Sequence, residues 1–153
     1  MKKEDRVPDA KWQLFVEPKD QQVAALRKQL SDFNIAKARA DRGFGLAIFV
    51  HDMKEDLVAG IYGWIWGACL EVDYLWVHEN LRGMGYGNKL MTDLENEAMA
   101  RGCQTAILDT YSFQAPAFYE SLGYECFGII DGYGPGYQKY FFRKELREEN
   151  DIT

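Results

Sequence analysis

The stretch VHENLRGMGYGN, residues 77–88, lies between an apolar segment that predicts a strand and a periodic segment that predicts a helix. Gly83, Gly85 and Gly87 let the backbone turn tightly and approach a ligand without a Cβ in the way. The first N–H groups of the following helix have no partner inside it and carry partial positive charge. With the permanent charge of Arg82 at the rim, the stretch predicts a cradle for a pyrophosphate.

A glycine-rich stretch between a strand and a helix can also be an ordinary turn without a ligand. The spacing of its glycines can be compared with two known nucleotide-binding loops. A Walker A loop ends in Gly-Lys-Ser/Thr, whereas Gly87 is followed by Asn88 and Lys89. A dinucleotide fingerprint needs G-x-G-x-x-G in the first strand–helix unit, whereas these glycines alternate with other residues and lie in mid-chain. Neither of these two loops fits the stretch.

Apolar periodicity predicts the elements around the loop. Strands are predicted over residues 12–16, 44–50, 57–66, 70–77, 105–110, 124–130 and 137–143. Helices are predicted over residues 86–101 and 115–121, and residues 37–42 are a short helix or a loop. An earlier helix has Asp20 as its N-cap and carries the apolar stripe Val23, Leu26, Leu30 and Phe33. This order predicts an antiparallel meander followed by parallel pairing, in a mixed α/β sheet with helices on both faces.

Composition limits the class of protein. The chain has 153 residues, which predicts one domain over residues 1–153, and a net charge of −6, which argues against a nucleic-acid partner. The sequence contains no run of about 18 apolar residues, so no membrane span is expected. No secretory signal is expected either, and a cytoplasmic location is predicted. Cys69, Cys103 and Cys126 show no metal-ligand spacing, which favours reduced thiols and no metal.

Two signatures in order carry a family resemblance. The pattern Arg82-x-x-Gly85-x-Gly87 resembles the coenzyme A pyrophosphate loop of the GCN5-related N-acetyltransferases (GNAT). Downstream, SFQAPAFYESLGY, residues 112–124, is similar to that family's second signature, Asn-x-x-Ala-x-x-Phe/Leu-Tyr-x-x-x-Gly-Phe/Tyr. The resemblance covers residues 44–144. Glu79 replaces a frequent proline, and Ser112 replaces the asparagine that commonly helps hold the pantetheine arm.

The resemblance implies the GNAT acyl-CoA N-acyltransferase fold, whose central mixed, mostly antiparallel sheet has splayed fourth and fifth strands. It implies acetyl-CoA as co-substrate without any metal, and family members are often homodimers. The residues that would bind the coenzyme lie on the fourth strand, in the loop and in the second signature: Leu75, Trp76, Val77, Arg82, Gly83, Met84, Gly85, Tyr86, Gly87, Asn88 and Ser112.

The candidate chemistry follows from the need for a neutral attacking amine, which a base provides. Glu71 and Asp73 lie on one face of the predicted fourth strand, and the apolar side chains at 70, 72, 74 and 76 lie on the other. Glu71 is the first choice for the base, although both carboxylates also fit a solvated face or a site for the substrate's charge. Tyr119 matches the family's tyrosine that protonates the departing thiolate, and it also fits an ordinary packed helix. His78 is a weaker candidate base.

The predicted function is transfer of an acetyl group from acetyl-CoA to an amine. The acidic balance favours a cationic small molecule or peptide as the acceptor. Several aromatic residues either line an acceptor pocket or belong to the core: Trp64, Trp66, Tyr111, Phe113, Tyr133 and Tyr137. Two alternatives stay open, a catalytically silent acyl-CoA sensor, which Ser112 favours, and an interaction module.

Overall fold

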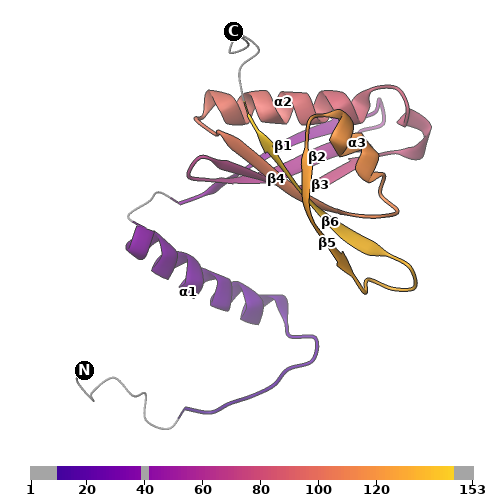
Figure 1. The fold of residues 1–153 in the computed structure, drawn as a ribbon. Helices are drawn as coiled ribbons and strands as arrows, with labels where there is room; N and C mark the ends of the chain where they lie inside the picture. The colour runs from indigo at the N-terminus through magenta and orange to yellow at the C-terminus, as the bar shows by residue number, and fades with distance from the viewer. Residues whose placement is uncertain (1–9, 39–41, 147–153) are drawn as a thin grey trace. The chain divides into compact units, whose positions relative to one another are not determined.

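The computed structural model describes residues 10–38 and 42–146, and the chain divides into two units, residues 1–40 and 41–153 (Figure 1). The single domain expected over residues 1–153 stays a prediction. In the two described ranges no helix is long and apolar enough to cross a membrane.

The first unit contains α1 (Asp20–Ala38), none of whose side chains is buried. The Lys19 carbonyl accepts the Val23 N–H, and the Lys19 N–H donates to Gln22 Oε1 at 2.9 Å. Lys19, and not the predicted Asp20, is therefore the N-cap, because Gln22 supplies the capping oxygen from inside the helix. Lys37 and Ala38 end α1, and residues 39–41 of the predicted second element lie outside the described residues.

The predicted strand over residues 12–16 is wrong. These residues form an irregular segment, and the Trp12 side chain is 96% exposed. A strand exists only where a neighbouring strand takes up its backbone N–H and C=O groups. Among the described residues, the sheet contains no strand that pairs with this segment. Apolar and aromatic composition alone therefore misled the prediction.

The second unit contains one six-stranded mixed sheet in the order β1-β2-β3-β4-β6-β5. Its strands are β1 (Phe44–His51), β2 (Leu57–Trp66), β3 (Cys69–Val77), β4 (Thr105–Tyr111), β5 (Glu125–Asp131) and β6 (Gln138–Glu145). The β3–β4 pair is parallel, and the other four pairs are antiparallel. The predicted mixed, mostly antiparallel sheet is confirmed, with element bounds close to those expected.

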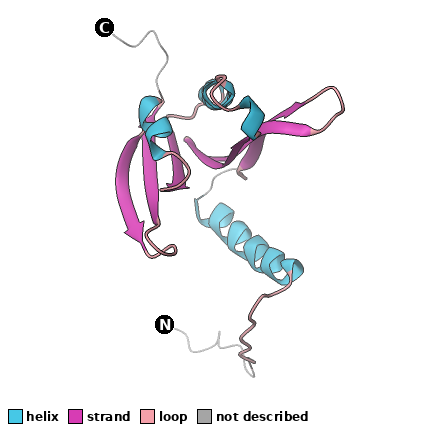
Figure 2. Cartoon of the chain, turned by 90° about the vertical axis from the view of Figure 1, so that its right-hand side faces the viewer, coloured by secondary structure: helices cyan, strands magenta, loops and turns pink. Residues whose placement is uncertain are grey.

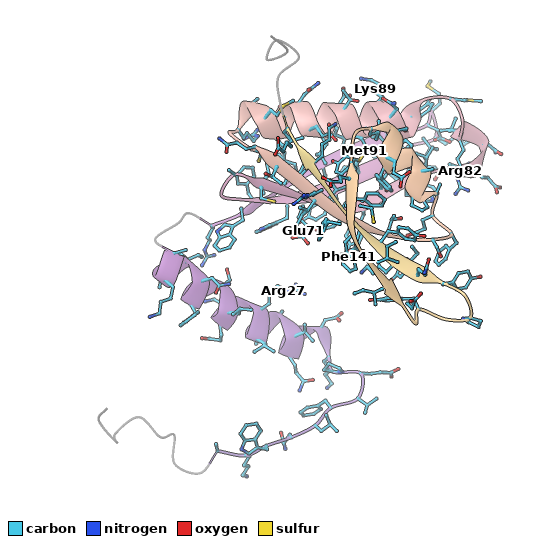
Figure 3. All side chains as sticks on the ribbon, in the orientation of Figure 1. Arg27, Glu71, Arg82, Lys89, Met91 and Phe141 are labelled. Carbon is cyan, nitrogen blue, oxygen red and sulfur yellow. The ribbon has the colours of Figure 1, made fainter. Side chains whose placement is uncertain are left out.

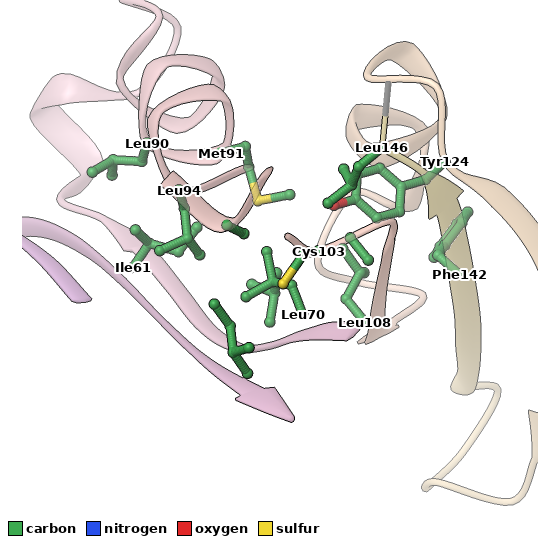
Figure 4. Packing of buried hydrophobic residues seen from close by; sticks show 14 of the residues in the cluster. Ile61, Leu70, Leu90, Met91, Leu94, Cys103, Leu108, Tyr124, Phe142 and Leu146 are labelled. Carbon is green, nitrogen blue, oxygen red and sulfur yellow. The ribbon is translucent and has the colours of Figure 1, made fainter. Parts of the chain in front are cut away.

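The helix α2 (Tyr86–Ala100) lies along one face of the sheet and packs against β1, β2 and β3. Its buried stripe includes Leu90, Met91 and Leu94, which belong to one core cluster with Ile61 and Leu70 of the strands (Figure 4). The short helix α3 (Pro116–Ser121) packs against the same core through side chains at 118 and 119. No helix within residues 42–146 covers the other face, so the predicted helices on both faces stay a prediction.

The splay of two neighbouring strands is confirmed, and it involves β3 and β4. Residues 69–72 of β3 pair with residues 105–108 of β4, and the pairing ends there although both strands continue (Figure 2). The strands beyond Val72 and Leu108 therefore diverge and leave backbone groups without a strand partner. These are the strands expected as fourth and fifth, since the segment 12–16 is not a strand.

A β-bulge at Asp73 changes which side chains of β3 share a face. Tyr62 on β2 pairs with Tyr74, but the next residue, Gly63, pairs with Val72, so Asp73 is an extra residue on β3. An extra residue breaks the two-residue alternation of a strand. Tyr74 and Trp76 are consequently exposed instead of sharing the buried face of Val72, as alternation had predicted. The strand face that carries Glu71 and Asp73 therefore also carries Tyr74 and Trp76.

Candidate active site

The loop between β3 and α2 presents free backbone N–H groups. Gly85 has a φ of 85°, adopts the left-handed conformation at the N-cap of α2 and provides no side-chain cap. The Lys89 N–H makes a helical bond with the Gly85 carbonyl at 3.0 Å, so the N–H groups of residues 86–88 precede it without a helical partner. A Cβ at Gly83 or Gly85 would meet nothing within 4 Å, so the loop faces open space. This geometry fits a pyrophosphate.

Arg82 closes the loop onto the end of β3. Its Nε donates to the Val77 carbonyl at 3.0 Å, and its side chain is exposed near the start of α2 (Figure 3). Met84 is exposed beside it, and Glu79, at the position of the family's proline, begins the short 3₁₀ helix η1 (Glu79–Leu81). The bond fixes the guanidinium stem, so the terminal nitrogens stay at the rim of the cradle.

The edge of β3 beyond Val72 offers backbone groups to a ligand. The His78 N–H donates to the Val58 carbonyl of β2 at 2.8 Å. Because consecutive residues of a strand point their backbone groups to opposite sides, those of Trp76 also face β2. The backbone groups of Leu75 and Val77 then face the gap between β3 and β4. The Val77 carbonyl accepts Arg82 Nε, and coenzyme binding by Leu75, Trp76 and Val77 stays a prediction.

Ser112 connects the end of β4 to β6. Its N–H donates to the Gln138 carbonyl at 2.9 Å, and its Oγ accepts the Gln138 N–H at 3.1 Å. The hydroxyl hydrogen is still available for another acceptor, since Oγ acts as an acceptor in this bond. The residue thus has a structural role, and its predicted contact with the coenzyme stays a prediction.

A cavity of about 350 Å³ opens where the pairing of β3 and β4 ends. Three carboxylates line it, from Glu71 and Asp73 on β3 and Asp109 on β4. The remaining lining is backbone and mostly apolar side chains of residues Val72, Tyr74, Ile107, Leu108, Phe127 and Phe141. Glu71 and Phe141 lie on the side of the sheet away from α2 in Figure 3. The structure therefore brings the two predicted carboxylates into one pocket.

The electrostatics of this pocket depend on Asp109, which the sequence analysis missed. Burial raises the pKa of Asp73, and the neighbouring charge of Asp109 raises it further. Asp109 itself forms an ion pair with Lys139 of β6 at 2.8 Å. The available signal was the alternation of β4, in which Asp109 is the single charged residue of an otherwise apolar or uncharged strand. Parallel pairing with β3 then places it beside Asp73.

Tyr119 of α3 lies on the opposite face of the sheet, toward α2. Its ring centroid is 5.1 Å from that of Phe118, 6.2 Å from Tyr124 and 6.0 Å from Phe142. Burial raises the pKa of Tyr119, so the phenol keeps its proton at neutral pH. The described residues provide no hydrogen-bond partner for its hydroxyl. The hydroxyl oxygen is not fully buried, so it is open to solvent or a ligand.

A buried polar network anchors the region around Tyr119. The Tyr124 hydroxyl donates to Glu95 of α2 at 2.8 Å, and Lys144 Nζ donates to the other oxygen of Glu95 at 2.6 Å. Burial raises the pKa of Tyr124, and the charge of Glu95 adds to the effect. The network ties α2 to β6 and fixes the ring that Tyr119 packs against. The sequence pattern gave no signal for it, because Glu95 lies within the apolar stripe of α2.

The late aromatic residues form a cluster near the pocket. Tyr111 and Phe113 stack at 5.3 Å, Tyr111 meets Tyr133 edge-on at 5.3 Å, and Phe113 meets Tyr137 edge-on at 5.0 Å. Phe113, Tyr133 and Tyr137 are exposed, so they do not belong to the core. Trp64 and Trp66 are also exposed, and Trp64 pairs with Glu71 across the β2–β3 ladder.

The environment of two cysteines favours the thiol over the thiolate. All three are free thiols, and burial raises the pKa of Cys69 and of Cys103. A raised pKa lowers the fraction of thiolate, which is the reactive form. The predicted reduced thiols are consistent with this environment.

Comparison with known proteins identifies the family. The model of the "Acetyltransferase (GNAT) family" matches residues 8–124. Blasticidin-S acetyltransferase of Streptomyces morookaense is 37% identical over 94 residues, which cover 61% of this chain and 69% of the relative. The crystal structure of an acetyltransferase from Bacillus cereus ATCC 14579 has a TM-score of 0.73 and 26% identity, and the match covers 88% of this chain and 98% of that one.

The fold is also shared with an aminoglycoside 6'-N-acetyltransferase crystallised with coenzyme A. That structure has a TM-score of 0.59 and 20% identity, and the match covers 90% of this chain and all of that one (100%). The family match spans most of the chain and includes the loop at residues 82–88 and the whole second signature at residues 112–124. This chain is therefore an acetyltransferase and belongs to the GNAT family.

Proposed function

We propose that this acetyltransferase moves an acetyl group from acetyl-CoA to the primary amine of a cationic small molecule or peptide, by direct attack in a ternary complex. The observation that carries the proposal is the three-carboxylate pocket at the end of the β3–β4 pairing. An acidic pocket attracts an ammonium group and lowers the cost of burying it. A structural neighbour is named as an N-acetyltransferase, which supports nitrogen as the acceptor atom.

The coenzyme side of the proposal rests on the loop and on the edge of β3. Acetyl-CoA supplies the acetyl group as a reactive thioester. The free N–H groups of residues 86–88 and the guanidinium of Arg82 would hold the pyrophosphate, with Gly83 and Gly85 permitting close approach. Gly87 instead leaves room for the Phe118 ring, which a Cβ would meet at 3.2 Å. The backbone groups of Leu75 and the N–H of Val77 would pair with the amides of the coenzyme's arm in the gap between the strands, since the Val77 carbonyl already accepts Arg82 Nε.

The chemical roles are divided between the two faces of the sheet. On the pocket face, Glu71 or Asp73 takes the proton of the amine, directly or through water, while the other carboxylate holds the substrate's charge. The amine nitrogen then bonds to the acetyl carbon, and the carbon–sulfur bond breaks. The nitrogen loses its second proton to solvent, and Tyr119, which burial keeps protonated by raising its pKa, donates its proton to the leaving sulfur and is reprotonated from solvent.

The test measures coenzyme A thiol release with acetyl-CoA and a panel of polyamines, aminoglycosides, blasticidin-S, amino acids and peptides. Turnover is expected with at least one cationic amine, and its kcat/KM should fall as salt screens the pocket. Glu71→Gln should lose most of the activity. A matched control is Glu97→Gln, because Glu97 is an exposed, ion-paired carboxylate on α2 that lies outside the pocket.

Two results would contradict the proposal. Salt-independent turnover of neutral acceptors alone would remove the electrostatic argument while leaving the family assignment intact. Tight binding of acetyl-CoA without turnover of any amine would favour the silent acyl-CoA sensor. The expected cytoplasmic location and homodimer stay predictions.

A further inference from the structure

The ammonium group of Lys139 lies in a cage of aromatic rings closed by a carboxylate. Its Nζ is 5.5 Å from the ring centroid of Tyr111, 5.8 Å from that of Tyr133 and 5.6 Å from that of Phe141. The same Nζ is 2.8 Å from Asp109 Oδ1, and the Lys139 side chain is only 20% exposed. Aromatic faces with a carboxylate are the surroundings that proteins use to bind organic ammonium groups. Here the chain fills such a site with its own side chain.

Strand register builds this cage. In the antiparallel β4–β6 pair, Tyr111 lies opposite Lys139 and Asp109 lies opposite Phe141, so all four point to the face away from α2. Tyr133 comes from the turn between β5 and β6 and covers the remaining side. The ion pair with Asp109 raises the pKa of Lys139, so its ammonium stays charged through neutral pH.

The cage shares a wall with the acceptor pocket. Asp109 and Phe141 belong to both, since they also line the cavity beside Glu71 and Asp73. Lys139 offsets the charge of Asp109, which leaves Glu71 and Asp73 as the carboxylates that face an incoming amine. An acceptor with a second ammonium group that reaches Asp109 would meet the positive charge of Lys139 there.

We propose that Lys139 is a specificity-determining residue that occupies a built-in ammonium site and so directs the enzyme toward acceptors with one ammonium group at this position. This inference rests on the proposed amine acceptor. Removing the side chain with Lys139→Ala should open a cage of three rings and one carboxylate to an external cation. Lys139→Met should remove the charge but keep the cage filled, and Lys139→Arg should keep both charge and filling.

The direct test titrates each purified variant with tetramethylammonium and follows the aromatic ring signals by nuclear magnetic resonance. Lys139→Ala should bind the probe at least about fivefold more tightly than the wild type, which is the effect of removing one like charge at about 4 Å in water. Lys139→Met should fall between them, and Lys139→Arg should match the wild type. Circular dichroism checks that each variant is folded, and Lys139→Met serves if Lys139→Ala does not fold.

A matched control is Arg101→Ala. Arg101 also combines an ion pair, with Glu97 at 2.6 Å, and a position over an aromatic ring, Phe44 at 5.5 Å, but it lies outside the pocket. This variant should bind tetramethylammonium no better than the wild type. Equal affinity of the wild type, Lys139→Ala and Lys139→Met for the probe would overturn the proposal.

The catalytic test compares kcat/KM for an alkyl monoamine and a diamine of the same chain length. The kcat/KM for the diamine divided by that for the monoamine should rise about fivefold in Lys139→Ala, from the same charge estimate. This ratio should stay unchanged in Arg101→Ala. An unchanged ratio in Lys139→Ala would refute the role in specificity. If the wild type acetylates no amine, the proposed function fails, whereas the tetramethylammonium titration still decides whether the cage is an ammonium site.

Discussion

Replacement of Tyr119 by phenylalanine removes one hydroxyl and keeps the ring. The ring contacts with Phe118, Tyr124 and Phe142, at centroid distances of 5.1 to 6.2 Å, do not involve that hydroxyl. The described residues also give it no hydrogen bond that the substitution would break. The free energy of unfolding should therefore change by less than about 0.5 kcal/mol, as for substitutions that leave packing and hydrogen bonds intact.

The effect on catalysis should be much larger. General acid catalysis is worth about 10²- to 10⁴-fold in rate. That range corresponds to about 3 to 5 kcal/mol of lost transition-state stabilisation. Because the proton is needed only as the thiolate leaves, the loss should appear in kcat, while the dissociation constant of acetyl-CoA changes little. The raised pKa of Tyr119 also predicts that kcat does not decline near neutral pH through ionisation of this phenol.

The assay measures kcat by thiol release at saturating acetyl-CoA and acceptor, and the dissociation constant by calorimetry. Tyr124→Phe is the matched control, because it removes a hydroxyl that donates to Glu95 at 2.8 Å and leaves the buried Glu95 with one partner fewer. It should lower the free energy of unfolding by about 1 to 3 kcal/mol with little change in kcat. Wild-type kcat in folded Tyr119→Phe would refute the reasoning and assign Tyr119 to packing alone.

Three further predictions concern the pocket and the loop. Glu71→Gln should reduce kcat/KM by more than about tenfold between pH 6 and 9, measured at low and high salt. If Asp73→Asn reduces kcat/KM more than Glu71→Gln does, Asp73 is the base. Asp73→Asn should be more stable than the wild type at neutral pH, because a raised pKa means that folding disfavours the charged carboxylate. This stability gap should narrow as the pH falls through the raised pKa of Asp73 and be closed below the ordinary aspartate value of 3.8, and thermal melts that show a constant gap would contradict it. Gly85→Val should weaken acetyl-CoA binding in calorimetry, because a φ of 85° strains a β-branched residue in the cradle. Gly102→Val is its control, with a φ of 91° and equally open space at the other end of α2, and equal losses of binding in the two variants would refute the loop assignment.

The sequence by itself determined most of the local structure. Strands β2 and β3 and the helix α2 were predicted within one residue of their observed bounds, because each has a strong apolar period and a turn at its end. The loop at residues 82–88 and the second signature at residues 112–124 led to the acetyltransferase family, because the spacing of their residues can be read from the sequence without knowing how the chain packs.

Three predictions from local pattern were wrong, because composition and alternation do not show which groups become hydrogen-bond partners. Residues 12–16 have the composition of a strand but pair with no strand among the described residues. Lys19 caps α1 in place of Asp20, because the Gln22 side chain supplies the capping oxygen. The bulge at Asp73 turned Tyr74 and Trp76 to the open face, since alternation assumes an unbroken ladder with β2.

Only the tertiary structure assembled the three-carboxylate pocket. Asp73 and Asp109 are far apart in sequence and meet because β3 and β4 pair in parallel and then diverge. Lys139 reaches Asp109 only through the register of the β4–β6 pair. The physical reason is that periodicity and turn chemistry act between near neighbours, whereas the charge of a pocket is a sum over strands whose order and register the whole sheet decides.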